Sequence, residues 1–309
     1  MRLIVAALAL CTACAGGFAS RQPRPSVPAA GGVKHLEEDF EGYNHVRMFE
    51  QSWRPADNQI RATLIILHGF KDHGTRYNEL GNRLAQHGYA VHAFDLRGFG
   101  SSGGRRVYVE SFDEYIEDLT SYVDVTRARE NGKPIFLLGH GLGGTIALEY
   151  VLEKKPQLAG LVLSGTALRS ELSGFKRAMV GALGTFLALL AIFPLDVDHV
   201  SQDQKVVQAC KDDPLIDQGN GPARTERELL NTMSKVVEHE GELRTPTLIL
   251  HGGADVIDNP EGSRDLFKRA NSEDKTLHVY DGMFHDLWRE PAKEQVMQDL
   301  ASWLDRHAG

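Results

Sequence analysis

Short apolar runs alternate with helix-like segments along most of the chain. Runs of the length of a buried strand occupy residues 62–66, 90–94, 135–138, 158–164, 247–250 and 277–280. Segments with apolar residues at helical spacing lie between them at 77–86, 112–130 and 145–152. Because parallel strands are joined by crossing helices, this alternation predicts an α/β domain with a mostly parallel central sheet and helices on both faces.

The alternation stops after Thr166. From about residue 168 to 243 no strand-like run is convincing and helical segments dominate, and the strand pattern returns at 247. Such an insertion is typical of a helical cap over the carboxyl edge of an α/β sheet, where ligands bind. We therefore expect a core made of residues 36–168 and 241–309, with a cap or lid at 169–240.

One stretch of this cap, residues 178–195, is apolar and carries no charge, which meets the minimum length for a membrane span. Gly181, Gly184 and Pro194 interrupt it, and it lies between strands of one sheet, so we do not expect it to span. We expect a lid helix that lines an acyl tunnel and leaves apolar surface for contact with lipid. The alternative is a cap helix buried on the core.

The N-terminal residues have the composition of an export signal. Arg2 precedes an apolar run at 3–10, and small residues end the segment at Cys14. The segment 1–14 resembles a bacterial lipoprotein signal, in which Cys14 becomes the lipidated N-terminus, and cleavage after Ala15 is the alternative. Residues 15–35 read as a flexible linker. We expect an exported protein, lipid-anchored to a bacterial membrane or else periplasmic or secreted.

Composition and charge exclude some partners. The 309 residues carry a formal net charge of −8, and no basic run or stripe is present, so a nucleic-acid partner is not expected. Only Cys210 lies in the globular part, so we expect no disulfide framework there. The core must therefore be stabilised by packing.

A glycine-rich turn, residues 139–144, lies between a predicted strand and a predicted helix, and two motifs compete for it. The nucleophile elbow G-x-S-x-G would place a reactive serine at position 141, which here is Gly141. The dinucleotide-binding motif G-x-G-x-x-G matches Gly139, Gly141 and Gly144. The choice between them decides the predicted function.

Residues later in the chain favour the elbow. A dinucleotide site needs an acidic residue at the end of the next strand, and the run at 158–164 ends without one. A hydrolase needs an acid after a later strand and a histidine after the last strand. Asp255 follows the run at 247–250, and His285 follows the run at 277–280. The order nucleophile position, acid, histidine is therefore present.

Several segments together resemble the monoacylglycerol lipase and lysophospholipase branch of the α/β-hydrolases, which is serine aminopeptidase-like. They are L-H-G-F-K-D-H-G-T-R-Y (67–77), D-L-R-G-F-G-S-S (95–102), G-H-G-L-G-G (139–144), K-D-D-P-L-I (211–216), H-G-G-A-D (251–255) and D-K-T-L-H-V-Y-D-G-M-F-H-D-L (274–287). That family's elbow reads G-H-S-[ML]-G-G. This chain differs from it at Gly141, the nucleophile position.

The resemblance implies an α/β-hydrolase fold and a set of site residues. Asp255 and His285 would be the acid and base of a triad, and the backbone N–H groups of Phe70 and Leu142 would form the oxyanion hole. Neither a cofactor nor a metal is implied. His68, His73, His140 and His251 form no H-E-x-x-H motif or Cys/His pair, so we expect them to be loop and core histidines.

The resulting hypothesis is a carboxylic-ester hydrolase of the serine type, acting on a monoacylglycerol or a lysophospholipid, in which Gly141 removes the nucleophile. Activity is then expected to be severely reduced or absent. The expected partners are a small acyl lipid and a membrane surface, reached through the lipid anchor and the cap. A non-catalytic lipid-binding pseudoenzyme is the main alternative, and a dinucleotide-dependent oxidoreductase is a further one.

Overall fold

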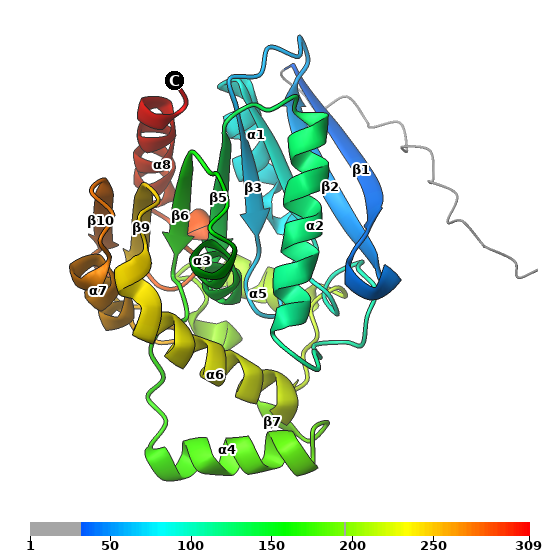
Figure 1. The fold of residues 1–309 in the computed structure, drawn as a ribbon, viewed down its shortest axis with the longest axis vertical. Coiled ribbons are helices and arrows are strands. Elements are labelled where there is room, and N and C mark those ends of the chain that lie inside the picture. Colours follow the sequence, from blue (N-terminus) through cyan, green and yellow to red (C-terminus); the bar gives the residue numbers. More distant parts are fainter. Residues whose placement is uncertain (1–31, 195) are drawn as a thin grey trace, which may run out of the picture.

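A central sheet of eight strands organises the part of the chain that the computed structural model describes, residues 32–194 and 196–309 (Figure 1). The strand order is β1-β2-β4-β3-β5-β6-β9-β10. The strands are β1 (Val33–Glu41), β2 (Arg47–Pro55), β3 (Ala62–Leu67), β4 (Tyr89–Phe94), β5 (Ile135–His140), β6 (Gly160–Ser164), β9 (Thr247–Gly252) and β10 (Lys275–Tyr280). β1, β2 and β4 pair antiparallel, and every pairing from β4 to β10 is parallel. The predicted α/β class with a mostly parallel sheet is confirmed.

Helices cover both faces of this sheet (Figure 1). Successive side chains of a strand point to opposite faces, so Leu64 and Ile66 of β3 pack with α1 and α8, whereas Ile65 and Leu67 pack with α2 and α3. The core helices are α1 (Asn78–Gln86), α2 (Asp113–Arg129), α3 (Leu142–Lys154), α7 (Pro260–Arg269) and α8 (Lys293–His307). Two continuous apolar cores, one on each face, hold the strands in register.

A buried ion pair fixes the loop after β4. Both the Nε and Nη2 atoms of Arg97 donate to the Asp118 carboxylate of α2, at 2.9 and 2.7 Å. Asp118 also accepts the backbone N–H of Tyr43 at 2.7 Å. Removing one member of such a pair leaves an uncompensated charge in the core, so this contact holds the β4 loop and α2 against each other.

The cap contains a small sheet as well as the helices expected there. Its helices are α4 (Gly174–Phe186), α5 (Gln204–Asp212) and α6 (Ala223–His239), and β7 (Ala191–Phe193) pairs antiparallel with β8 (Gly221–Pro222). The expectation that this region lacks strands was wrong. The two strands are too short to give a periodic pattern, and they form only because residues far apart in the sequence meet.

The apolar stretch 178–195 is not one helix, which corrects a second expectation. α4 begins at Gly174, where the side chain of Ser173 accepts the N–H of Lys176, and it ends at Phe186. α4 packs mainly on α6, and only Val180 and Gly184 of α4 are buried. Phe175 and Phe186 are 80% and 83% exposed. In the described residues, no helix combines the length and apolarity needed to cross a membrane.

The predicted boundary of the N-terminal linker was wrong. β1 begins at Val33 and pairs with β2 from that residue on, so the last three residues assigned to the linker 15–35 belong to the sheet. β1 lies at the edge of the sheet, and most of its residues on both faces are only partly buried, so it gives no clear alternation. The predicted signal peptide at 1–14, its Cys14 and the linker up to residue 31 lie outside the described residues.

Candidate active site

The turn after β5 joins this strand to helix α3. The physical requirement for glycine differs from one position of the turn to the next. A Cβ atom on Gly139 would lie 2.3 Å from the carbonyl oxygen of Gly143, and one on Gly143 would lie 2.4 Å from the carbonyl oxygen of Leu67. Both contacts are with backbone, which cannot move aside. These two positions therefore accept only glycine, because the helix α3 starts in direct contact with β3 and β5.

Gly141 sits at the tip of the elbow, with φ 52° and ψ −118°, a conformation that is strained for any residue with a Cβ. Space for a side chain nevertheless exists there. The nearest atom to a Cβ on Gly141 would be Nε2 of His285, at 3.3 Å, and the next residue met would be Gly69, with its Cα at 3.6 Å. The side-chain direction of position 141 therefore points at the imidazole of His285.

Asp255 and His285 are in contact, although 30 residues separate them. Asp255 lies in the loop after β9 and His285 in the loop after β10. The Nδ1–H of His285 donates to Oδ2 of Asp255 at 2.8 Å. The other ring nitrogen, Nε2, therefore faces position 141. The other oxygen of Asp255 accepts the N–H groups of Ile257 and Asp258, at 2.8 and 3.0 Å. The carboxylate is thereby held in one orientation.

The surrounding carboxylates set the protonation of His285. Burial by itself lowers the pKa of His285, but the charge and hydrogen bond of Asp255, with Asp258 and Asp286 nearby, raise that pKa to about 9. Burial raises the pKa of Asp255, yet His285 and His251 outweigh it and hold that pKa well below its usual range. The pair is therefore a carboxylate with a strongly basic imidazole.

Asp258 is a second carboxyl beside the imidazole that the sequence did not single out. Its Oδ2 lies 3.9 Å from Nδ1 of His285. Burial raises the pKa of Asp258 to about 6 despite the charge of His285. It therefore ionises near neutral pH and adds to the field that favours the protonated imidazole. Its only sequence signal is its position three residues after Asp255.

The other histidines near the turn have structural partners. His140, whose ring centre lies 4.5 Å from that of His285, donates from Nδ1 to the carbonyl oxygen of Ser164 at 3.1 Å, and burial and the charge of His285 lower its pKa to about 4. Nε2 of His68 accepts the N–H of Leu96. Nε2 of His251 donates to the carbonyl oxygen of Asp258. Within the described residues, no group of three or more metal-ligand side chains is arranged to hold a metal ion.

The two residues predicted to form the oxyanion hole line the same cavity as Gly141 and His285. Leu142 is the first residue of α3, so its N–H is one of the four at a helix start that lack an intrahelical acceptor. Phe70 follows Gly69 in the loop after β3. The Cα of Gly69 would lie 3.6 Å from a Cβ atom on Gly141. The helix start also favours negative charge at this point. The arrangement can stabilise an oxyanion that develops next to position 141.

The cavity has a volume of about 220 Å³. Its wall is largely apolar, with Val197, Val200, Ile216 and Leu229 of the cap and Ile257 of the loop after β9 lining it. No residue of α4 lines it, and among the described residues of the 178–195 stretch only Pro194 does, so the expected tunnel-lining lid helix was wrong. α4 is not buried on the core either, because its exposed side chains face away from the domain.

One end of the cavity is polar, which the sequence reasoning missed. Nε of Arg76 lies 2.7 Å from Oδ1 of Asp72, and its Nη2 lies 3.3 Å from Oδ2 of Asp286. Burial raises the pKa of both carboxyls, but Arg76 and Arg289 reverse this and hold them ionised. Asp72 and Arg76 lie within the quoted segment 67–77, and Asp286 follows His285. Only the fold shows that they meet.

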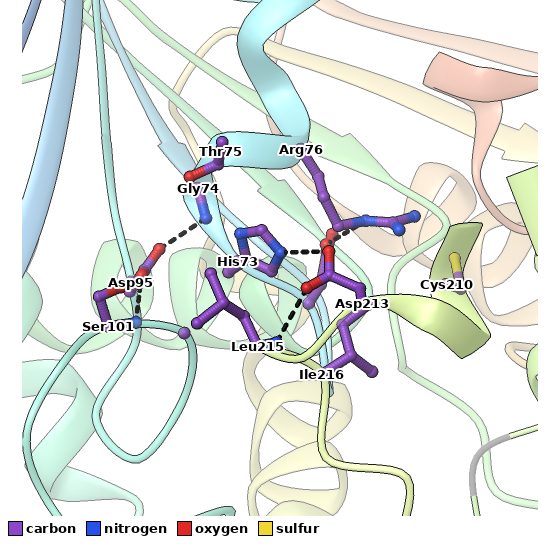
Figure 2. A network of polar contacts seen from close by, with 12 residues as sticks. His73, Gly74, Thr75, Arg76, Asp95, Ser101, Cys210, Asp213, Leu215 and Ile216 are labelled. Atoms are coloured by element: carbon purple, nitrogen blue, oxygen red, sulfur yellow. Dashed lines mark hydrogen bonds and ion pairs between the residues drawn. The ribbon is translucent and has the colours of Figure 1, made fainter.

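Figure 2 shows how the loop after β3 is attached to the cap. Nε2 of His73 lies 2.9 Å from Oδ2 of Asp213, and Oδ1 of Asp213 accepts the N–H of Leu215 at 2.9 Å. On the core side, Asp95 accepts the N–H groups of Gly74 and Ser101, at 2.6 and 2.7 Å. The loop that carries Phe70 is thus held from both sides. His73 and Asp213 belong to two of the quoted segments.

Comparison with known proteins finds a matching family and several similar lipases. Residues 58–292 match the family described as serine aminopeptidase, S33. A monoacylglycerol lipase of Mycolicibacterium smegmatis is 33% identical over 273 residues, which are 88% of this chain and 97% of that protein. Human monoglyceride lipase is 32% identical over 264 residues, 84% of this chain and 87% of the relative. The crystal structure of the Paleococcus ferrophilus monoacylglycerol lipase superposes with a TM-score of 0.76 at 28% identity, covering 84% of this chain and 99% of that one.

Proposed function

Because the chain belongs to the serine aminopeptidase S33 family of α/β-hydrolases, we propose that its cavity binds the acyl ester of a single-chain lipid, a monoacylglycerol or a lysophospholipid. The apolar wall accepts the acyl chain, and the polar end formed by Asp72, Arg76 and Asp286 accepts the head group. The names of the relatives support the lipid-ester class.

One observation carries the assignment of the reactive centre: the side-chain direction of Gly141 meets Nε2 of His285 at 3.3 Å. With serine at 141, His285 would take the hydroxyl proton while Asp255 holds the imidazole tautomer. The N–H groups of Phe70 and Leu142 would stabilise the tetrahedral oxyanion. The acyl group would pass to the serine oxygen and then to water, releasing a fatty acid.

Glycine at 141 removes the nucleophile, so an acyl-enzyme cannot form at this position. In serine proteases, removing the serine lowers turnover by about 10⁶-fold, and about 10³ to 10⁴ over water remains from the oxyanion hole and binding. We therefore expect this chain to bind its lipid with the geometry of an ester hydrolase and to cleave it very slowly. A pure lipid carrier would not need the Asp255–His285 contact. Its presence favours an ester hydrolase that has lost its nucleophile.

The test compares this chain with its Gly141→Ser variant on a monoacylglycerol and on a short-chain chromogenic ester. We expect turnover to rise by about 10⁴-fold or more in the serine form, and the double variant Gly141→Ser, His285→Gln to lose it. The same samples are titrated with a non-hydrolysable alkyl glycerol ether. If the ether binds but the serine form is inactive, the lipid-binding pseudoenzyme replaces this proposal, and if it does not bind, the lipid assignment is wrong.

The membrane surface is the second partner in this proposal. The exposed apolar side chains of the cap supply one contact, and they are Phe175, Met179, Phe186, Leu187, Leu189 and Leu190. A lipid on Cys14 would supply the other contact. Two contacts are needed because a single acyl chain anchors a protein only weakly and reversibly. We expect the exported, lipidated chain to float with vesicles in a density gradient. Cys14→Ser should reduce flotation, and Phe175→Ser with Phe186→Ser should reduce it further, whereas unchanged flotation in all variants would refute both contacts.

A further inference from the structure

Lys71 is a buried lysine in the wall of the cavity. It lies between Phe70, which carries a predicted oxyanion donor, and Asp72 of the polar end, and all three residues line the cavity. The lysine is only 4% exposed. Its Nζ donates to the carbonyl oxygen of Gly219, which precedes β8 in the cap, and lies 5.8 Å from the centre of the Phe70 ring. A cation is therefore buried where the core loop, the cap and the cavity meet.

Lys71 differs in its partners from the arginine in the same wall. Arg76 contacts the carboxylates of Asp72 and Asp286, and Asp286 also pairs with Arg289. Two guanidinium groups thus balance two carboxylates at the polar end. Within the described residues, no carboxylate pairs with Lys71, whose hydrogen-bond acceptor is a backbone carbonyl. Because an ammonium group has three N–H donors, Lys71 keeps donors and a charge with which it can bind an anion.

The position of Lys71 is unfavourable for a lysine in two respects. Its φ of 54° lies in the left-handed region that favours glycine. Burial lowers the pKa of Lys71, and the charge of Asp217 only partly opposes this, so the surroundings disfavour the ammonium form. A glycine at this position would avoid both costs. Strained residues and residues with perturbed pKa values cluster at functional sites, which points to a bound ligand as the compensation.

We propose that Lys71 binds the phosphate of a lipid head group, so that the cavity prefers a lysophospholipid to a neutral monoacylglycerol. This inference rests on the proposed binding of an acyl ester in the same cavity. With the ester carbonyl at the N–H groups of Phe70 and Leu142, the head group lies towards Asp72 and Arg76, beside Lys71. A phosphate oxygen there accepts an N–H of the ammonium group in a charge-assisted hydrogen bond. The paired carboxylates of the polar end are left to contact hydroxyl groups.

The experiment titrates the full chain in a calorimeter with 1-O-octylglycerol, a neutral ether, and with its 3-phosphate. Lys71→Met keeps the length of the side chain but removes its charge, and Lys71→Gly removes the charge and also relieves the backbone strain. Lys133→Met is the matched control, because Lys133 is exposed, lies outside the cavity wall and changes the net charge equally. We expect this chain and the control to bind the phosphate ether about tenfold or more tightly than the neutral ether. Both Lys71 variants should lose this preference and still bind the neutral ether.

The outcomes separate this inference from a structural role of Lys71 and from the proposed function. If Lys71 only attaches the cap through Gly219, Lys71→Met weakens both ethers by the same factor, which refutes head-group binding. Equal affinity of this chain for the two ethers also refutes it and leaves the acyl-ester site standing. If inorganic phosphate or glycerol 3-phosphate binds as tightly as the phosphate ether, the site takes a free phosphate compound and the lipid assignment of Lys71 is wrong. If neither ether binds, the proposed function fails and this inference fails with it.

Discussion

Restoring a side chain at position 141 should destabilise the protein. The backbone there has a φ of 52°, which glycine adopts freely and other residues do not. A residue held in such a conformation costs about 1–3 kcal/mol. In addition, the Cβ must approach Nε2 of His285 to 3.3 Å, a tight contact that the imidazole has to relieve by moving slightly. Both effects act in the folded state only.

The alanine and serine variants should differ by one hydrogen bond. Serine can form a hydrogen bond with Nε2 of His285, accepting its N–H when the imidazole is protonated, which offsets the strain by about 1 kcal/mol, whereas alanine cannot. We therefore expect Gly141→Ala to lose about 1–3 kcal/mol of unfolding free energy and Gly141→Ser about 1 kcal/mol less than that. Urea denaturation followed by circular dichroism measures both, provided that the slope against urea stays constant.

Two other glycines serve as controls for this reasoning. Gly143→Ala would place a Cβ 2.4 Å from the carbonyl oxygen of Leu67, so we expect a loss above about 4 kcal/mol or no folded protein. Gly181 lies within α4 with nothing near its Cβ position, so Gly181→Ala should stabilise by about 0.5–1 kcal/mol. If Gly141→Ala and Gly141→Ser are as stable as this chain, the elbow is not strained and our account of why glycine is tolerated there is wrong.

Four further predictions concern the charged groups. In the Gly141→Ser form, Asp255→Asn should lower kcat by about 10⁴-fold with a small change in KM, because the imidazole loses the carboxylate that holds its tautomer. Ester hydrolysis kinetics measure this, and a loss of kcat below about tenfold would contradict it. Since the pKa of His285 is raised to about 9, the neutral base accumulates only as pH rises, so kcat/KM of the serine form should increase with pH with a midpoint near pH 9. Asp258→Asn should shift this midpoint downward, and a midpoint near 6.5 in the Gly141→Ser form itself would refute the raised pKa. The same raised pKa contributes stability that is present below about pH 6.5 and lost as pH rises through 9, which urea titrations at several pH values measure. Asp118→Asn should destabilise by about 3–5 kcal/mol because its arginine partner stays charged and buried, and a change under 1 kcal/mol in urea would show that the pair is dispensable.

The core of the fold follows from local patterns. Six apolar runs fall on β3, β4, β5, β6, β9 and β10, and the three helical segments fall on α1, α2 and α3. β3, β4, β5, β6 and β9 are buried on both faces, so they stand out in the sequence as continuous apolar runs. The cap was harder to predict. α4 packs one side on α6 but leaves Phe175 and Phe186 exposed. A sequence pattern does not distinguish an apolar side chain that faces solvent from one that faces the core.

The sequence by itself determined the order of the elements, the positions of Asp255 and His285 after their strands, and the absence of a hydroxyl at position 141. Those are properties of single residues and of short periodic segments. Only the tertiary structure decided that position 141 faces His285 at 3.3 Å, that Asp258 lies beside the imidazole, and that Arg76 joins Asp72 to Asp286. The reason is that parallel strands bring loops from distant parts of the chain to one edge of the sheet, and the distances between those loops depend on packing rather than on any local pattern.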